Sequence, residues 1–211
     1  MREVALPDAL ARHALVMALE GGDQVPLASF GPEELELAAA LRSTRRREWL
    51  LSRFAAKTLA VRLGLCAEPA DCTLPTSGER PSLRIGGEAS SLAVSLSHSR
   101  QFAAAAIDRA AIGIDIEFVR TLDERAAHLF MTDDELTAVR RTPTSDALLH
   151  FWCAKEAAWK TLSHVFPTLK KTPLEITAAS SDSMTMVSAL GINVVTCRPE
   201  PSLIVSLART V

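Results

Sequence analysis

The stretch Ile112-Gly113-Ile114-Asp115-Ile116-Glu117 alternates along the chain with the period of two that is typical of a β-strand. In such a strand the isoleucines share one face, and Asp115 and Glu117 share the other. Side chains two residues apart on one face lie ~7 Å apart, so both carboxylates can reach one hard cation. Gly113 has no side chain, and we expect it to leave this face open for a ligand. An edge strand with solvated acids would show the same pattern. Other motifs in the sequence are needed to distinguish a metal site from such a strand.

A second stretch, residues 151–160, has the sequence FWCAKEAAWK and favours a helix. Trp152, Glu156 and Lys160 are four residues apart and fall on one helical stripe, with Lys155 beside it. A third carboxylate flanked by lysines could complete an all-oxygen magnesium site while the lysines contact phosphate oxygens. The alternative is a surface pair between Glu156 and Lys160, worth ~0.3–0.5 kcal/mol, with the tryptophans in the core.

A third cluster, Ser95-Leu96-Ser97-His98-Ser99, ends another expected strand. His98 between two hydroxyls could donate a hydrogen bond to a phosphate, or it could be a satisfied turn histidine. A serine hydrolase would place its nucleophile in a G-x-S-x-G elbow. The sequence contains no such elbow, so hydrolysis is set aside.

The amino-terminal half combines helix and strand patterns. His13 to Leu19 could be an edge strand, and a long helical region starts at Gly31-Pro32 and ends at Leu63, with Gly64 as its terminator. Residues 69–87 are rich in Pro, Ser, Thr and Gly and predict a loop with at most a short strand at Ser82 to Ile85. Three further strands are expected at Leu92–Ser97, Phe102–Ile107 and Ala111–Phe118.

The carboxy-terminal half repeats this mixture. Thr132 and Glu135 form a capping box before a short helix that ends near Arg141. Thr144 or Ser145 can cap a longer helix that ends before Pro167. Strands are expected at Leu174–Ala179, Met184–Leu190, Ile192–Cys197 and Leu203–Leu207. Each half therefore offers helix plus antiparallel strands, which predicts an α+β fold, although no sequence repeat is strong enough to prove duplication.

Composition excludes several classes of protein. The 211 residues are 48% hydrophobic and carry a net charge of −2, which excludes a disordered chain and gives no basic footprint for general nucleic-acid binding. No signal peptide or membrane span is indicated, so we expect a cytoplasmic protein. The cysteines lack zinc-site spacing and are expected to be reduced, buried or idle thiols: Cys66, Cys72, Cys153 and Cys197.

The three motifs together, at residues 95–99, 112–117 and 151–160, resemble the ordered signature of the 4′-phosphopantetheinyl transferases. Arg53 and Arg62 in an R-x8-R arrangement, and Arg80-Pro81 in place of the Gly-Lys/Arg-Pro motif, extend the resemblance. The length resembles the Sfp-type subgroup. That resemblance implies a monomer of two similar lobes, residues 1–111 and 112–211, each with a long helix on a small antiparallel sheet and with the active site between the lobes.

The resemblance also implies an activity, the transfer of 4′-phosphopantetheine from coenzyme A to a serine of an apo acyl or peptidyl carrier protein. Adenosine 3′,5′-bisphosphate would be released, and neither nucleic acid nor membrane would be a partner. Magnesium would be held by Asp115, Glu117 and Glu156. Glu156 or a metal-bound water would take the serine proton, and Lys160 would neutralise phosphate charge. The coenzyme would be bound by Arg53, Arg80, Pro81, Ser97, His98, Lys155 and Lys160.

The sequence departs from the family pattern at two places. Glu79 separates Gly78 from Arg80, which puts the adenosine contact in doubt. The segment Leu37 to Leu41 is apolar where some relatives have lysines for the 3′-phosphate, so Arg42 or Arg45 would have to substitute.

Other functions stay open from the sequence. A non-catalytic coenzyme A-binding regulator could share the fold. A magnesium nuclease or phosphatase would use two metals and a fourth acid that we do not find, and a DNA-contacting helix at Arg42 to Arg62 conflicts with the net charge. For the carrier protein, we expect a docking surface that includes Arg125, Phe130 or Met131.

Overall fold

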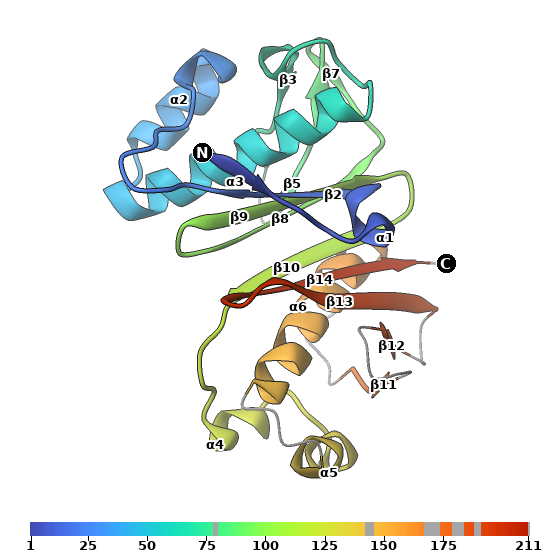
Figure 1. Cartoon of the computed structure of the whole chain (residues 1–211). Coiled ribbons are helices and arrows are strands. Elements are labelled where there is room, and N and C mark those ends of the chain that lie inside the picture. The colour runs from blue at the N-terminus through green and yellow to red at the C-terminus, as the bar shows by residue number, and fades with distance from the viewer. Residues whose placement is uncertain (78–79, 142–145, 167–173, 179–183, 188–190, 211) are drawn as a thin grey trace. The chain divides into compact units, whose positions relative to one another are not determined.

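The computed structural model describes residues 1–211 apart from 78–79, 142–145, 167–173, 179–183, 188–190 and 211. The chain forms two compact units, Met1–Arg109 and Ala110–Val211 (Figure 1). The sequence prediction placed the division after residue 111. Each unit combines helices with antiparallel strands, which confirms the α+β prediction.

The first unit is built on a four-stranded antiparallel sheet in the order β1-β2-β9-β8. The long helix α3 (Ser43–Arg62) packs on β2, β8 and β9, and Figure 1 shows it crossing this sheet. Its inner face contributes Leu51, Ala55 and Leu59 to the core. The sheet strands are β1 (Arg2–Val4), β2 (Ala14–Ala18), β8 (Ala93–Ser99) and β9 (Phe102–Asp108).

The smaller elements of this unit surround the helix. They are α1 (Asp8–Ala11), η1 (Leu27–Ser29), α2 (Pro32–Ala39), η2 (Pro69–Asp71), β3 (Cys72–Thr73), β4 (Thr76–Ser77), β5 (Arg80–Pro81), β6 (Arg84–Ile85) and β7 (Glu88–Ala89). Strands β3, β6 and β7 form one small sheet, and β4 pairs with β5. Only the second half of the expected strand at Ser82–Ile85 forms a strand, β6, and the prediction of at most one short strand in residues 69–87 is wrong, because β3, β4 and β5 also lie there.

Two other sequence predictions for this unit are also wrong. Strand β2 is not an edge strand, because β1 and β9 flank it and all its residues are buried. The long helical region is two helices, because α2 ends at Ala39 and Arg42 has an extended backbone before α3 starts. The break has a physical reason. Glu34 of α2 contacts Lys57 of α3, whereas 23 residues of one continuous helix would hold the two side chains ~35 Å apart.

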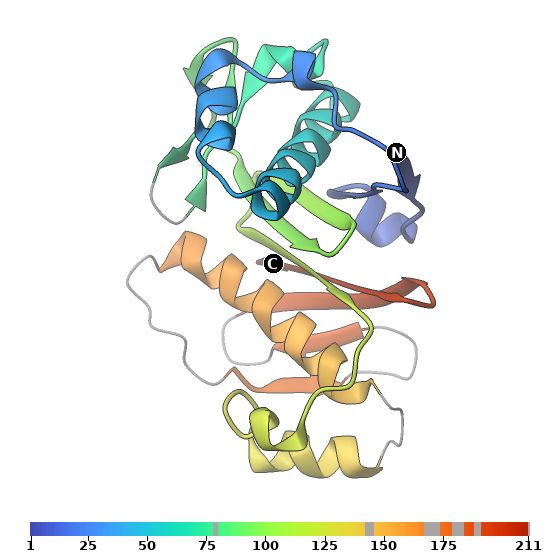
Figure 2. The same cartoon turned by 90° about the vertical axis from the view of Figure 1, so that its left-hand side faces the viewer.

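The second unit is a five-stranded antiparallel sheet in the order β10-β14-β13-β12-β11. Helix α6 (Ala147–Val165) packs on β10, β13 and β14, and Figure 2 shows it lying along the sheet. The strands are β10 (Ile112–Phe118), β11 (Ile176–Ala178), β12 (Met184–Val187), β13 (Ile192–Glu200) and β14 (Leu203–Thr210). Two short helices, α4 (Glu124–Ala127) and α5 (Asp133–Arg141), precede α6.

The predicted helix starts in this unit have different outcomes. The capping box is confirmed: the Thr132 amide donates to Glu135 Oε2 at 2.7 Å, and the Glu135 amide donates to Thr132 Oγ1 at 3.3 Å. Helix α6 instead begins at Ala147 after Asp146. The suggested caps Thr144 and Ser145 lie outside the described residues.

Each unit contains a fully buried lysine–glutamate pair of the same construction. In the first unit, Lys57 Nζ on α3 donates to Glu34 Oε2 at 2.7 Å and to the Cys72 carbonyl at 2.5 Å. In the second, Lys155 Nζ on α6 donates to Glu135 Oε2 at 2.6 Å and to the Phe130 carbonyl at 2.6 Å. In both pairs the glutamate also accepts from the backbone amide three residues before it, at the start of the short helix. The pairs therefore tie a short helix to the long helix of each unit.

The cysteine prediction is confirmed. All four cysteines are free, and Cys72, Cys153 and Cys197 are buried. Burial raises the pKa of Cys197 to about 11, so this thiol stays protonated at neutral pH. Among the described helices, none combines the length and hydropathy of a membrane span.

Candidate active site

Strand β10 presents its two carboxylates to helix α6. Ile112, Ile114 and Ile116 on the opposite face are buried, as the alternation predicts. The prediction that Gly113 leaves the acidic face open is wrong. A Cβ atom at Gly113 would lie 2.0 Å from the Ala157 carbonyl oxygen and 2.7 Å from the Thr161 amide nitrogen. The glycine therefore admits the backbone of α6 against the strand, and this close approach brings the helix side chains to the acids.

The helical stripe predicted from the sequence meets the acidic face. Lys160 Nζ lies 2.7 Å from Asp115 Oδ1 and donates to the Ile114 carbonyl at 2.8 Å. Two turns earlier, Trp152 Nε1 donates to Glu117 Oε1 at 3.0 Å. Glu156 lies on the same stripe, one turn from each of these contacts, and is partly buried. The structure thus brings two residues of the predicted stripe, Lys160 and Trp152, into contact with the strand acids.

The two carboxylates lie in a partly desolvated environment. Asp115 is buried, and the Glu117 side chain is 17% exposed. Burial raises the pKa of Glu117, and repulsion from Asp115 adds to that increase, whereas Arg120 and the Trp152 hydrogen bond oppose it. A bound cation would relieve this repulsion.

The donor chemistry of the strand pair fits a hard divalent cation, because both residues offer carboxylate oxygens and repel one another. The predicted trio is not assembled as a metal site in this structure. Across the described residues, no group of three or more His, Cys, Asp or Glu side chains could hold a metal ion. Lys160 and Trp152 instead contact one oxygen of Asp115 and one of Glu117.

Lys155 lies in a different place from the one predicted for it. The sequence suggested a phosphate contact, but this side chain is completely buried. Its ammonium group is paired with Glu135 and the Phe130 carbonyl, as Lys57 is paired in the first unit. Burial lowers the pKa of Lys155, and the hydrogen bond to Glu135 counteracts that effect. The structure therefore gives Lys155 a role in holding α5 against α6.

This assignment makes a stability prediction. Lys155→Met leaves the Glu135 carboxylate buried without its cation, and we expect a loss of about 3 kcal/mol in the free energy of unfolding. Urea denaturation measures the loss. Adding Glu135→Gln should recover much of it, because the amide oxygen can still accept from the Thr132 amide. The affinity of the folded variant for coenzyme A should equal that of the wild type. If Lys155 instead contacted a phosphate of the coenzyme, the variant would bind coenzyme A more weakly.

Further residues expected to bind phosphate lie in the first unit. His98 on β8 forms a hydrogen bond with Arg45, and its Nδ1 lies 3.6 Å from Glu48 Oε2. Arg53 is buried with its guanidinium 3.6 Å from the centre of the Trp49 ring. Arg53 Nε also donates to the Leu74 carbonyl at 3.3 Å. Burial lowers the Arg53 pKa to about 10, which still leaves it charged at neutral pH.

The remaining predicted residues of this unit have separate surroundings. Ser97 is buried on β8, one residue before His98. Arg62 is paired with Glu3, with Nη1 and Oε1 2.8 Å apart. Arg80 and Pro81 form β5, where Arg80 pairs with Ser77 and Pro81 with Thr76, and the Arg80 side chain lies outside the described part of the structure. The predicted metal ligands and Lys160 thus belong to the second unit, and the other expected coenzyme contacts, apart from Lys155, belong to the first.

The sequence analysis missed the part played by Trp152. It offered this tryptophan as a core residue. The indole packs edge-on against Phe130, with ring centroids 5.0 Å apart, and against Trp159 at 6.4 Å. Its N–H nevertheless holds the Glu117 carboxylate. The signal was present in the spacing, because Trp152 precedes Glu156 by one helical turn and a buried indole N–H requires an acceptor.

Comparison with known proteins gives one family match, and it lies within the second unit. No curated protein matches the chain. Residues 111–187 match the family model of the 4′-phosphopantetheinyl transferase superfamily. That stretch contains β10 and α6, and with them both strand carboxylates, Trp152, Glu156 and Lys160. Residues 111–187 of this chain are therefore similar to the 4′-phosphopantetheinyl transferase superfamily.

Proposed function

We propose that this protein transfers 4′-phosphopantetheine from coenzyme A to a serine of an apo carrier protein, as a member of the single-chain, two-lobed subgroup. One observation carries the proposal. Within the stretch similar to the superfamily, Asp115 and Glu117 meet Lys160 and Trp152 across β10 and α6. Displacement at a phosphorus centre depends on positioning and on neutralising charge, and this arrangement concentrates acids and a lysine for that purpose.

Each of the site residues in the second unit would have its own role in the proposed reaction. Asp115, Glu117 and Glu156 would hold a magnesium ion, which when bound supplies positive charge against the coenzyme pyrophosphate. Lys160 would neutralise charge on the phosphate under attack and on the departing adenosine 3′,5′-bisphosphate. Glu156 would accept the proton of the carrier serine. At the same time the serine oxygen would bond to phosphorus, and the pyrophosphate bond of the coenzyme would break. Trp152 would hold Glu117 in position through its indole N–H.

Residues of the first unit would bind the coenzyme. His98, Ser97 and Arg53 would contact its phosphates, and Arg80 with Pro81 would contact the adenosine. Arg45 is hydrogen-bonded to His98, which supports it as the substitute for the lysines that some relatives carry. Lys155 has no part in this set, because its ammonium is buried against Glu135.

The decisive experiment is incubation with coenzyme A, magnesium and a panel of apo carrier proteins, followed by intact mass measurement. Addition of the phosphopantetheine mass to any carrier would support the transferase. Binding of coenzyme A without modification of any carrier would favour the alternative, a regulator with the same fold. A protein that neither binds coenzyme A nor modifies a carrier would contradict both.

The structure leads us to revise the residues proposed for carrier docking. Phe130 and Met131 are 5% and 7% exposed and belong to a core cluster with Ala127 and Leu136, so they are not available as contacts. Their neighbour Leu129 is 87% exposed. An apolar side chain that is this exposed, just after α4, is a better candidate for docking an apolar residue of the carrier.

We therefore expect Leu129→Glu to raise the Michaelis constant for an acidic carrier about tenfold, because the change removes an apolar contact and adds repulsion. Affinity for coenzyme A should stay unchanged. Steady-state kinetics with the carrier as the varied substrate measures the effect. Leu63→Glu is the matched control, since Leu63 is also exposed but lies at the end of α3. Equal kinetics for wild type and the Leu129 variant would place carrier docking elsewhere.

A further inference from the structure

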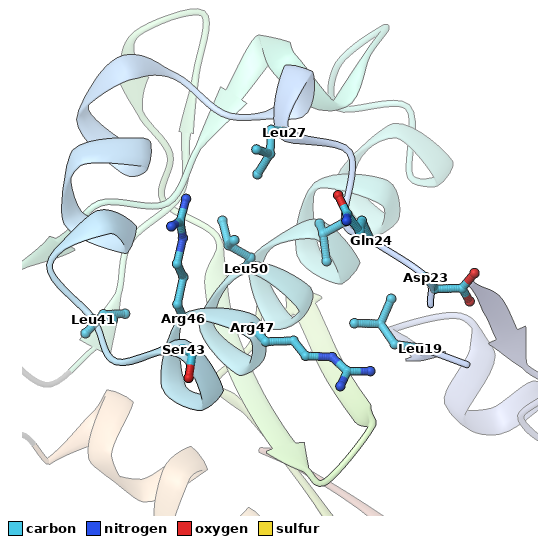
Figure 3. Close-up of a pocket in the computed structure, with 10 residues that line it drawn as sticks. Leu19, Asp23, Gln24, Leu27, Leu41, Ser43, Arg46, Arg47 and Leu50 are labelled. Atoms are coloured by element: carbon cyan, nitrogen blue, oxygen red, sulfur yellow. The ribbon is translucent and has the colours of Figure 1, made fainter. Parts of the chain in front are cut away.

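A pocket of about 440 Å³ lies in the first unit, between the segment after β2, the turn between α2 and α3, and the start of α3. This volume is within the range of about 300–1,000 Å³ that small-molecule sites occupy. Its wall includes none of the residues to which the proposed transfer reaction assigns a role. The lining residues are Leu19, Asp23, Gln24, Val25, Leu27, Leu41, Ser43, Arg46, Arg47 and Leu50 (Figure 3).

Half of the lining is aliphatic. Leu19, Val25 and Leu50 are almost completely buried, and we call these three residues the floor of the pocket, whereas Leu27 is 47% exposed. Water in such a space finds few hydrogen-bond partners, so an apolar ligand can replace it favourably. None of the described residues that line the pocket is aromatic, so a nucleotide base would find no ring among them to stack on. The floor therefore suits a flexible aliphatic chain.

The polar side of the pocket is cationic. Arg46 lies beside Leu50 in Figure 3, and Arg47 extends toward Asp23. Among the residues that the structure describes, the Arg46 guanidinium has no hydrogen-bond or ion-pair partner. Asp23 is already engaged, because its Oδ2 accepts from the Glu20 amide at 3.0 Å and forms an ion pair with the terminal ammonium of Met1. The open charge at the pocket is therefore positive.

The helix adds to this charge. Helix α3 begins with no acidic residue in its first turn and no side-chain cap. Its first backbone N–H groups and its dipole already favour an anion at this end, yet the sequence places Arg45, Arg46 and Arg47 there. Arg45 has the Glu48 carboxylate 3.6 Å away, and Arg47 acts on the charge of Asp23. Arg46 is therefore the arginine at this positive helix end that an anionic ligand would neutralise.

We propose that this pocket binds an aliphatic chain of medium length that ends in an anionic head group. The chain would lie on Leu19, Val25 and Leu50, and the head group would accept hydrogen bonds from Arg46. This inference does not depend on the transfer reaction. Each of the two proposals can be refuted without affecting the other.

The test is calorimetric titration of the full chain with decanoate, decyl phosphate and decan-1-ol. We expect saturable binding of one or both anions, and at least tenfold weaker binding of the neutral alcohol, because a hydrogen bond to a charged group is lost. The two anions distinguish a carboxylate head from a phosphate head. Equal affinity for decan-1-ol and the anions, or no saturable binding of either anion, would overturn the proposal.

Variants locate the ligand. Arg46→Gln should weaken decanoate binding about tenfold, and Leu27→Asp should weaken it by placing a carboxylate at the edge of the pocket. Arg84→Gln, at an exposed arginine on β6, is the control and should bind like wild type. Amide shifts in a ¹⁵N spectrum should concentrate at residues 23–27 and 43–50. Unchanged affinity in folded Arg46→Gln, or shifts confined to other regions, would contradict this site.

Discussion

Gly113→Ala should destabilise the protein by more than about 4 kcal/mol, the range reached only by severe core changes. The added Cβ would stand 2.0 Å from the Ala157 carbonyl oxygen and 2.7 Å from both the amide nitrogen and Oγ1 of Thr161. Two of these three atoms belong to the backbone of α6, so no side-chain rotation relieves the clash. The helix must move away from β10, which also separates Lys160 from Asp115. Urea denaturation followed by far-UV circular dichroism measures the loss.

Gly21→Ala is the matched control for this prediction. In the described part of the structure, no atom lies within 4 Å of the position that a Cβ at Gly21 would take. Its replacement should change the free energy of unfolding by no more than about 0.5 kcal/mol. If Gly113→Ala proves as stable as the control variant, the close approach of strand and helix is not a feature of the folded protein.

Replacing the carboxylates should have the largest effect on activity. Asp115→Asn, Glu117→Gln and Glu156→Gln should each reduce transfer by ~10²–10³-fold, the scale seen when a charge-stabilising group leaves an active site. The proteins should remain folded, and in Glu117→Gln the amide oxygen can still accept from Trp152. The rate of carrier modification, followed by intact mass, measures the effect. Removing divalent cations with EDTA should abolish transfer in the wild type as well.

The control for the carboxylates is Asp134→Asn, at an exposed acid in the first turn of α5. It should transfer at the wild-type rate. Full activity in EDTA, or in the Glu117 variant, would refute the metal assignment while leaving open transfer by another mechanism. Loss of transfer in the Asp134 variant as well would mean that general destabilisation explains the result.

The sequence alone determined most of the main helices and strands, and it identified the strand and the helix stripe that carry the candidate site. Alternation with a period of two identified β10, and spacing by four residues put Trp152, Glu156 and Lys160 on one stripe of α6. The capping box at Thr132 was also correct. These signals are local, because strand periodicity, helical spacing and backbone capping depend on residues within a few positions of each other.

The tertiary structure decided which of those side chains face a ligand and which hold the fold together. Spacing puts Lys160 on the stripe of Glu156 and Lys155 beside it, but it does not show which of the two ammonium groups is buried. Only the packing of α5 shows that Lys155 is buried against Glu135, while Lys160 reaches Asp115. In the same way, only the structure shows that Leu129 is exposed while its neighbour Phe130 is buried. It also shows that the backbone of α6 occupies the space over Gly113. These distinctions depend on contacts between segments far apart in the chain, and such contacts leave no periodic pattern in either segment.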